Sequence, residues 1–148
     1  MVKMNAGMRE LLKKTNSKCT LNIADYCTSI VSKTKCINDC ILYDEFGDLE
    51  QKKINWDFVL KNHQDWTGYE VSRNEILISE LLFHEKYVFD FLSELKNQLK
   101  DKFPQRKFCI IMSYGDRAHL RFHTFRVMEG LWLSPEVDEY EEPILYDL

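Results

Sequence analysis

The sequence has few of the residues that interrupt regular structure, with only 5 glycines and 3 prolines among 148 residues. This scarcity excludes collagen-like, linker-like and low-complexity chains. Positive charge is not in excess either, because 20 Lys and Arg are outnumbered by 24 Asp and Glu, for a formal net charge of −4. This balance excludes a protein that binds phosphate groups through a basic charge over its whole surface. A local basic patch remains compatible with it.

Long apolar runs are also missing. The run over 108–112 is five residues long, whereas a membrane-spanning helix needs about 20. No continuous apolar block of the kind found in a signal peptide follows the charged N-terminal residues. We therefore expect a cytoplasmic protein that makes no contact with a membrane.

The cysteine pattern argues against both disulfides and a structural metal. The five cysteines are Cys19, Cys27, Cys36, Cys40 and Cys109, an odd number that favours reduced thiols when no signal peptide is predicted. None of them forms the Cys-x-x-Cys pair that binds zinc in structural sites. We expect no cofactor and no metal; a metal site, if one exists, is expected at the Cys19–Cys40 cluster.

The residues that are abundant predict a globular fold. The chain is 45% hydrophobic and 13% aromatic, and its length suits one domain over residues 1–148. The clearest helix signal begins at Ser72, because Ser72-x-x-Glu75 fits a capping box. An apolar stripe then runs from Leu77 to Leu99 in steps of four and three residues. The sequence thus predicts one long central helix over 72–102, with His84 as a hydrogen-bonded core histidine.

Weaker patterns predict shorter elements. These are a helix over 23–31 capped by Asn22, a strand over 40–43, a helix over 54–60, and short strands over 131–133 and 144–146.

A β-hairpin is predicted in the last third of the chain. Its strands cover 108–114 and 118–127, and a tight turn at Gly115-Asp116 joins them. That turn places Ile110 opposite Arg121. The apolar face of the hairpin is expected to pack on the helix stripe, so that Ile111, Leu120 and Phe122 meet Leu81, Val88 and Phe91. A helix on one face of an antiparallel sheet is an α+β fold.

The other face of the second strand carries a possible catalytic row. His119, Arg121 and His123 are spaced two apart and so share one face of a strand. Two imidazoles and a guanidinium suit phosphoryl transfer, with acid, base and anion-binding roles. The repeated His-x-Ser/Thr pattern of two-histidine phosphoesterases is not present. A strand that faces solvent or a partner explains the same residues, and we prefer that interpretation.

Negative charge is concentrated at the C-terminus. Residues 134–148 contain six acids and no Lys or Arg, so the first 133 residues carry a net charge of +2. Aromatic residues interleave with these acids, a combination that can attract and then hold a basic protein surface; a solvated tail is the alternative. The predicted partner-binding residues are Trp132, Glu136, Asp138, Glu139, Tyr140, Glu141, Glu142 and Tyr146.

In its size, its mild acidity, its free thiols and its acidic, aromatic C-terminal segment, the chain resembles bacterial toxin-immunity proteins of the contact-dependent growth inhibition type. The resemblance implies a cytoplasmic protein, not an enzyme, that neutralises a basic toxin domain, such as a nuclease, by covering its active site. It implies no direct contact with nucleic acid. The alternative is a phosphodiesterase or RNase that uses His119, Arg121 and His123.

Overall fold

The computed structural model describes residues 1–14, 20–49, 54–63 and 65–148. Its helices are α1 (Ala6–Lys13), α2 (Ile23–Val31), α3 (Trp56–His63), α4 (Trp66–Arg73) and α5 (Val88–Lys102), with short 3-10 helices η2 (Glu80–Leu82) and η3 (Val137–Glu139). Its strands are β1 (Val2–Met4), β2 (Thr34–Ile37), β3 (Cys40–Tyr43), β4 (Ile76–Leu77), β5 (Phe108–Tyr114), β6 (Ala118–Thr124) and β7 (Ile144–Asp147). No helix among these residues is long and apolar enough to cross a membrane.

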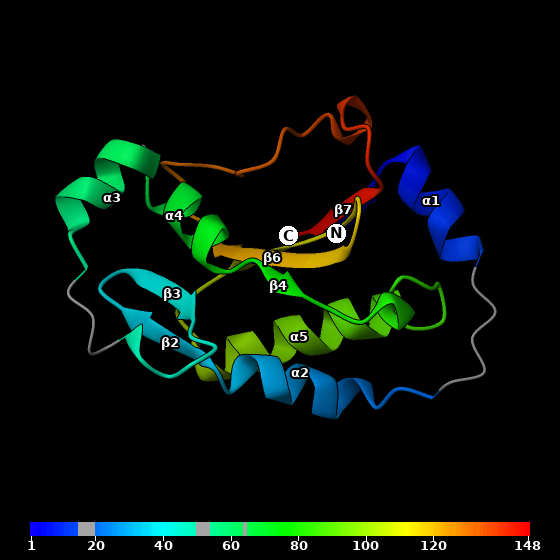
Figure 1. The fold of residues 1–148 in the computed structure, drawn as a ribbon, viewed down its shortest axis with the longest axis horizontal. Coiled ribbons are helices and arrows are strands. Elements are labelled where there is room, and N and C mark those ends of the chain that lie inside the picture. The colour runs from blue at the N-terminus through cyan, green and yellow to red at the C-terminus, as the bar shows by residue number, and fades with distance from the viewer. Residues whose placement is uncertain (15–19, 50–53, 64) are drawn as a thin grey trace.

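The main sheet has five antiparallel strands in the order β1-β7-β5-β6-β4 (Figure 1). The first strand therefore pairs with the last, and β5 lies at the centre. β5 is buried at every position except Tyr114, as its continuous apolar run predicts. Strands β2 and β3 form a separate hairpin whose turn residue Asn38 adopts φ 55°, a conformation that Asn tolerates well.

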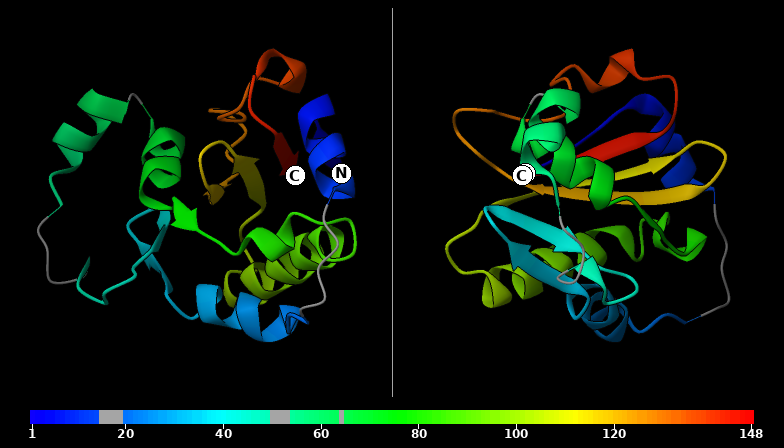
Figure 2. Two further views of the ribbon diagram at one scale, coloured as in Figure 1. Left: turned by 45° about the vertical axis from the view of Figure 1, so that its right-hand side comes forward. Right: turned by 60° about the vertical axis from the view of Figure 1, so that its left-hand side comes forward.

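Helices α2 and α5 cover one face of the sheet, and the segment that leads to β7 crosses the other (Figures 1 and 2). The inner core joins Phe91, Leu95 and Leu99 of α5 to Phe122 of β6. A smaller outer core forms where the segment that contains Leu133 packs on the opposite face of β5 and β7. The fold is thus α+β, as the sequence predicts.

The prediction of one helix over 72–102 was wrong in its first half. Helix α4 ends at Arg73, and its C-cap residue Asn74 is fully buried. The Asn74 side chain donates to Ile41 O and Phe122 O and accepts from Tyr43 N. The chain then pairs with β6 through β4, so the capping box at Ser72 does not form. Only 88–102 forms the predicted amphipathic helix.

Because the helix begins only at Val88, His84 is not part of it. It lies half-buried in the turn before α5, where its Nδ1 accepts from Lys86 N. The prediction that it sits on a helix stripe in the core was wrong, because the apolar residues before it form β4 and the 3-10 helix η2 instead of one continuous α-helix.

The predicted hairpin exists, but its register differs by one residue. A three-residue loop, 115–117, replaces the two-residue turn, and Ile111 lies opposite Arg121. Ile111 therefore faces the outer core, contrary to the prediction. Phe122 faces the inner core with Val88 and Phe91 and has no exposed surface, as predicted. Leu81 is half-buried and lies outside that core.

The short elements follow the sequence more closely. Asn22 caps α2 by accepting from Asp25 N, and β3 covers the predicted residues. Helix α3 begins at Trp56 instead of residue 54. β7 confirms the strand predicted over 144–146, whereas residues 131–133 form no strand.

Candidate functional site

A polar cluster lies on the outer face of β6, beside the outer core. It consists of Glu75, Ser113, His119 and Arg121. Glu75, which follows α4, places its Oε1 atom 3.4 Å from His119 Nε2 and 3.0 Å from Arg121 Nη2. Arg121 also donates from Nη1 to Ser113 Oγ at 3.1 Å. Glu75 thus contacts both basic side chains, and Arg121 links it to Ser113.

Two surface hollows flank Glu75. One, of about 390 Å³, is lined by His63, Ser72, Arg121 and Trp132 as well as by Glu75. The other, of about 460 Å³, lies beside His119 and Arg117. The first offers a carboxylate, a guanidinium and an indole that is 47% exposed, a set able to hold a planar or charged side chain from another molecule.

The structure separates His123 from the other two members of the predicted row. His123 is completely buried; its Nδ1 donates to Thr124 O at 2.9 Å, and its Nε2 accepts from Trp132 N at 3.5 Å. Burial lowers the pKa of this imidazole. His123 therefore holds the Trp132 segment in place and does not face the hollows beside Glu75.

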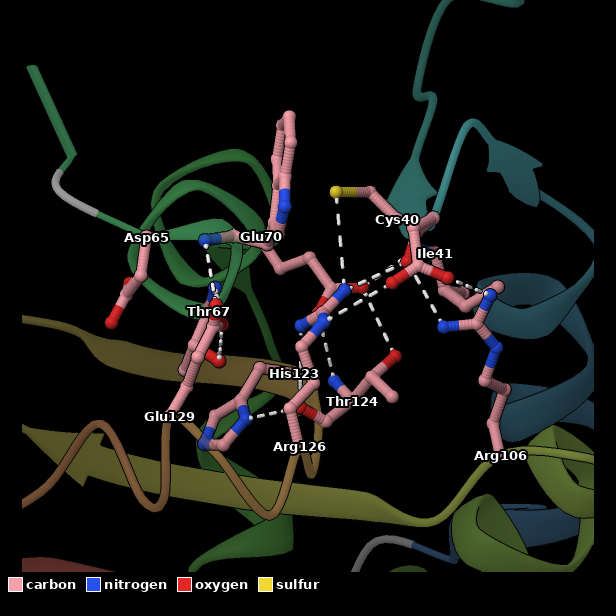
Figure 3. A network of polar contacts seen from close by, with 12 residues as sticks. Cys40, Ile41, Asp65, Thr67, Glu70, Arg106, His123, Thr124, Arg126 and Glu129 are labelled. Atoms are coloured by element: carbon pink, nitrogen blue, oxygen red, sulfur yellow. Dashed lines mark hydrogen bonds and ion pairs between the residues drawn. The ribbon is translucent and has the colours of Figure 1, made fainter. Parts of the chain in front are cut away.

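Behind this face lies a buried ionic network centred on Glu70 of α4 (Figure 3). Glu70 is fully buried and accepts from Ile41 N at 2.6 Å, Thr124 N at 3.0 Å, Thr124 Oγ1 at 3.1 Å and Arg126 Nη1 at 2.5 Å. Burial raises the pKa of the Glu70 carboxyl, and the guanidinium of Arg126 opposes that rise. These contacts tie α4 to both sheets.

Arg126 extends the network to the β2–β3 turn. Its Nη2 donates to Asp39 O at 2.7 Å, and Arg106 binds the Asp39 carboxylate at 2.9 Å (Figure 3). Glu129 accepts from Trp66 N, Thr67 N and Thr67 Oγ1, at the positive end of α4. The network fixes the segment that carries Trp132. Sequence spacing gave no signal for it, because its members come from distant elements.

The acidic segment is held on the surface, and five of its six acids are exposed. Its exposed acids are Glu136, Asp138, Glu139, Glu141 and Glu142. Among residues 1–14, 20–49, 54–63 and 65–148, no Lys or Arg forms an ion pair with them. The predicted aromatic residues differ in position: Tyr140 is half-buried, with its hydroxyl accepting from Ser134 N at 3.0 Å. Tyr146 is 3% exposed within β7, so its predicted contact with a partner was wrong.

Asn5 fixes the backbone of this segment. Its Nδ2 donates to Glu142 O at 2.8 Å and to Tyr140 O at 3.3 Å, while its Oδ1 accepts from Met8 N and Ile144 N. Asn5 is 3% exposed. Sequence analysis missed it, although an Asn before the amphipathic segment 6–13 is a recognisable helix cap.

The described residues contain no group of three or more His, Cys, Asp or Glu side chains placed to hold a metal ion. Cys27, Cys36, Cys40 and Cys109 are free thiols, and burial raises the pKa of Cys27, Cys40 and Cys109 to about 12. Such thiols stay protonated near neutral pH and are poor metal ligands. Cys19, part of the cluster singled out in the sequence, lies outside the described residues.

Together these features define a small α+β protein with an anchored acidic surface and an adjoining polar cleft. The chain matches the model of the uncharacterized protein PM0498 family over residues 3–148, and it belongs to that family. Comparison with curated proteins gave no match, and comparison with solved structures gave none.

Proposed function

We propose that the protein binds and neutralises a basic protein partner, in the manner of an immunity protein that inhibits a cognate nuclease toxin. The observation that carries the proposal is the set of five exposed carboxylates between 136 and 142, which find no cationic partner among the described residues. Uncompensated charge of one sign on a fixed surface favours a partner of the opposite sign.

The acidic segment and Trp132 are expected to act at different stages of binding. Carboxylates attract a basic surface before contact, and so raise the association rate. A half-exposed indole buried on contact lowers the dissociation rate, as hot-spot aromatics do. The hollow between Trp132 and Glu75 provides space for a side chain of the partner.

The segment is also pre-organised. Asn5 holds its backbone at two carbonyl groups, and the Tyr140 hydroxyl holds Ser134 N. A surface that is already ordered loses less conformational entropy when it binds. Inhibition of this kind requires coverage of the partner's active site and no catalytic group in the inhibitor.

The test uses as the partner a basic protein that co-purifies with the intact protein, with association followed by stopped-flow fluorescence. The test variant converts Glu136, Asp138, Glu139, Glu141 and Glu142 to the corresponding amides. The matched control converts the exposed acids Glu45, Asp57, Glu85, Asp90 and Asp101 in the same way. The test variant is expected to lower the association rate at least tenfold and the control less than threefold. Equal effects, or no salt dependence, would refute the proposal.

Trp132→Ala tests the anchor separately. We expect the dissociation rate to rise about 30-fold, which corresponds to roughly 2 kcal/mol, with the association rate nearly unchanged. Surface plasmon resonance measures both rates. A dissociation rate within twofold of that of the original protein would show that Trp132 is not an anchor residue of the interface.

A second candidate function is phosphodiester cleavage, favoured by the contact of Glu75 with both His119 and Arg121. In that function His119 acts as a base and Arg121 binds the phosphate. Purified protein that cleaves RNA, and loses the activity in His119→Ala, would establish it. Because His123 is buried, His123→Asn is expected to leave such an activity in place.

A further inference from the structure

A basic groove lies on the opposite side of the main sheet from the acidic segment. It is formed where the last turns of α5 approach the start of β5, and its volume is about 160 Å³. The residues that line it are Lys96, Asn97, Lys100, Arg106, Lys107 and Phe108. Four are cationic and none is acidic, although the whole chain carries a net charge of −4.

Two of the four cations are fixed by carboxylates outside the groove. Lys96 binds Asp147 at 3.3 Å, and Arg106 binds Asp39 at 2.9 Å. Lys100 and Lys107 are exposed and form no ion pair with any carboxylate of the described residues. The negative end of the α5 dipole accounts for a lysine within the helix, but not for Arg106 and Lys107, which lie beyond it.

Two aromatic side chains contact residues that line the groove, and each ring has a lysine beside it. Phe103 and Phe125 are both half-buried, and Lys102 Nζ lies 5.6 Å from the centre of the Phe103 ring. Lys107 Nζ lies 5.6 Å from the centre of the Phe125 ring. Phe103 packs on the groove residue Phe108 at 6.2 Å between ring centres. Single-stranded nucleic acids are bound by this combination, with cations along the backbone and aromatic rings against the bases.

We propose that this groove binds the phosphate backbone of a single-stranded nucleic acid, with Phe103 and Phe125 placed to stack on bases. The site goes beyond the proposed function and does not depend on it. It departs from the expectation, drawn from the sequence, of no direct contact with nucleic acid, and the experiment below tests which of the two holds.

The acidic segment does not prevent such binding. Its five exposed acids, between 136 and 142, precede the first residue of β7, whereas the sixth acid, Asp147, lies at the other end of that strand and binds the groove residue Lys96. The four residues of β7 extend for roughly 10–13 Å, which exceeds the screening length of about 8 Å at physiological salt. The segment and α5 also lie on opposite sides of the sheet (Figure 1).

The test measures fluorescence anisotropy of a labelled single-stranded RNA of mixed sequence, about 12 nucleotides long, with the whole protein. We expect a Kd of roughly 1–100 µM at physiological salt and tighter binding at low salt. The logarithm of the affinity should fall with the logarithm of the salt concentration with a slope of about 3, because four phosphate contacts contribute about 0.7 each.

Paired variants locate the site. Lys100→Gln with Lys107→Gln is expected to lower affinity at least tenfold and to reduce the slope to about 1.5. The matched control, Lys13→Gln with Lys61→Gln, removes the same charge from exposed lysines elsewhere and is expected to change affinity less than twofold. No binding at low salt, or equal losses in both pairs, would overturn the proposal.

Two further measurements, one on a variant and one by competition, identify the class of ligand. Phe125→Leu is expected to lower affinity for the RNA at least fivefold without changing the salt slope. Tripolyphosphate or duplex RNA that competes as well as the single strand would overturn the assignment to a single strand. Amide substitution of the acidic segment should not weaken RNA binding, so failure here is distinguishable from failure of the proposed function.

Discussion

At the scale of single residues, His123 makes stability depend on pH. Burial lowers the pKa of its imidazole in the folded protein, whereas in the unfolded chain the pKa is about 6.5. As the pH falls below that value, the unfolded state binds a proton that the folded state resists. The contribution of His123 is therefore complete above about pH 7 and is lost on acidification.

His123→Asn tests this prediction, because Asn retains an N–H donor and does not titrate. We expect the free energy of unfolding of the original protein, measured in urea, to fall more between pH 7.5 and pH 5.5 than that of the variant. A difference between the two proteins that is the same at both pH values would contradict it.

The second prediction for single residues concerns the contribution of the Glu70–Arg126 ion pair to stability. Arg126→Met leaves the fully buried Glu70 without its cation, and we expect a loss of about 3–5 kcal/mol. Adding Glu70→Gln removes the uncompensated charge, so the double variant is expected to be more stable than Arg126→Met alone. Urea unfolding of the two single variants and the double variant gives the coupling between the residues. Additive losses would show that the ion pair does not act as a unit.

At the scale of elements, the two faces of β6 are expected to respond differently to substitution. Phe122→Ala removes a ring with no exposed surface and is expected to cost about 3–5 kcal/mol. Arg121→Ala, on the open outer face of the same strand, is expected to cost less than about 1 kcal/mol. Thermal and urea denaturation measure both. Similar losses would mean that the outer face contributes as much to stability as the core.

The same hairpin shows how far the sequence determines an element. The apolar alternation of Leu120 and Phe122 identified the buried face of β6 correctly. The register of β5 was wrong because all its neighbouring residues are apolar, so the pattern does not say which face each occupies. The length of the loop between β5 and β6 sets the register, and Gly115 is compatible with loops of more than one length. Likewise, apolar residues at helical spacing before 88 form β4 and η2, because tertiary pairing with β6 overrides local pattern.

At the scale of the whole molecule, we expect no metal to be needed for folding. Treatment with a strong chelator should leave the melting temperature unchanged, since the described thiols are buried or isolated. Calorimetry with and without the chelator checks this. A large drop would point to a metal site that includes Cys19 and its neighbours in sequence.

A candidate site could be predicted from the sequence only where all its residues come from one segment of the chain. The five acids between 136 and 142 lie in one short segment, so the sequence revealed their charge and the structure added only their exposure. The basic groove combines α5 with the turn before β5, and the Glu70 network combines three elements. Such sites exist only after the chain has folded, and local patterns do not contain them. Asn5 shows the intermediate case, since its role as a helix cap is local but its hold on Glu142 is not.

The pairing of β1 with β7 has a consequence for protein synthesis. β1 is complete after the fourth residue, but its hydrogen-bonding neighbour is residues 144–147. At about 5–20 residues per second, the ribosome needs roughly 7–28 s to reach that neighbour. During this time β1 has no strand to join, and β7 must then enter between it and β5. The main sheet therefore closes only after translation has passed β7, and a nascent chain stalled earlier is expected to expose an unpaired edge of β5 to chaperones.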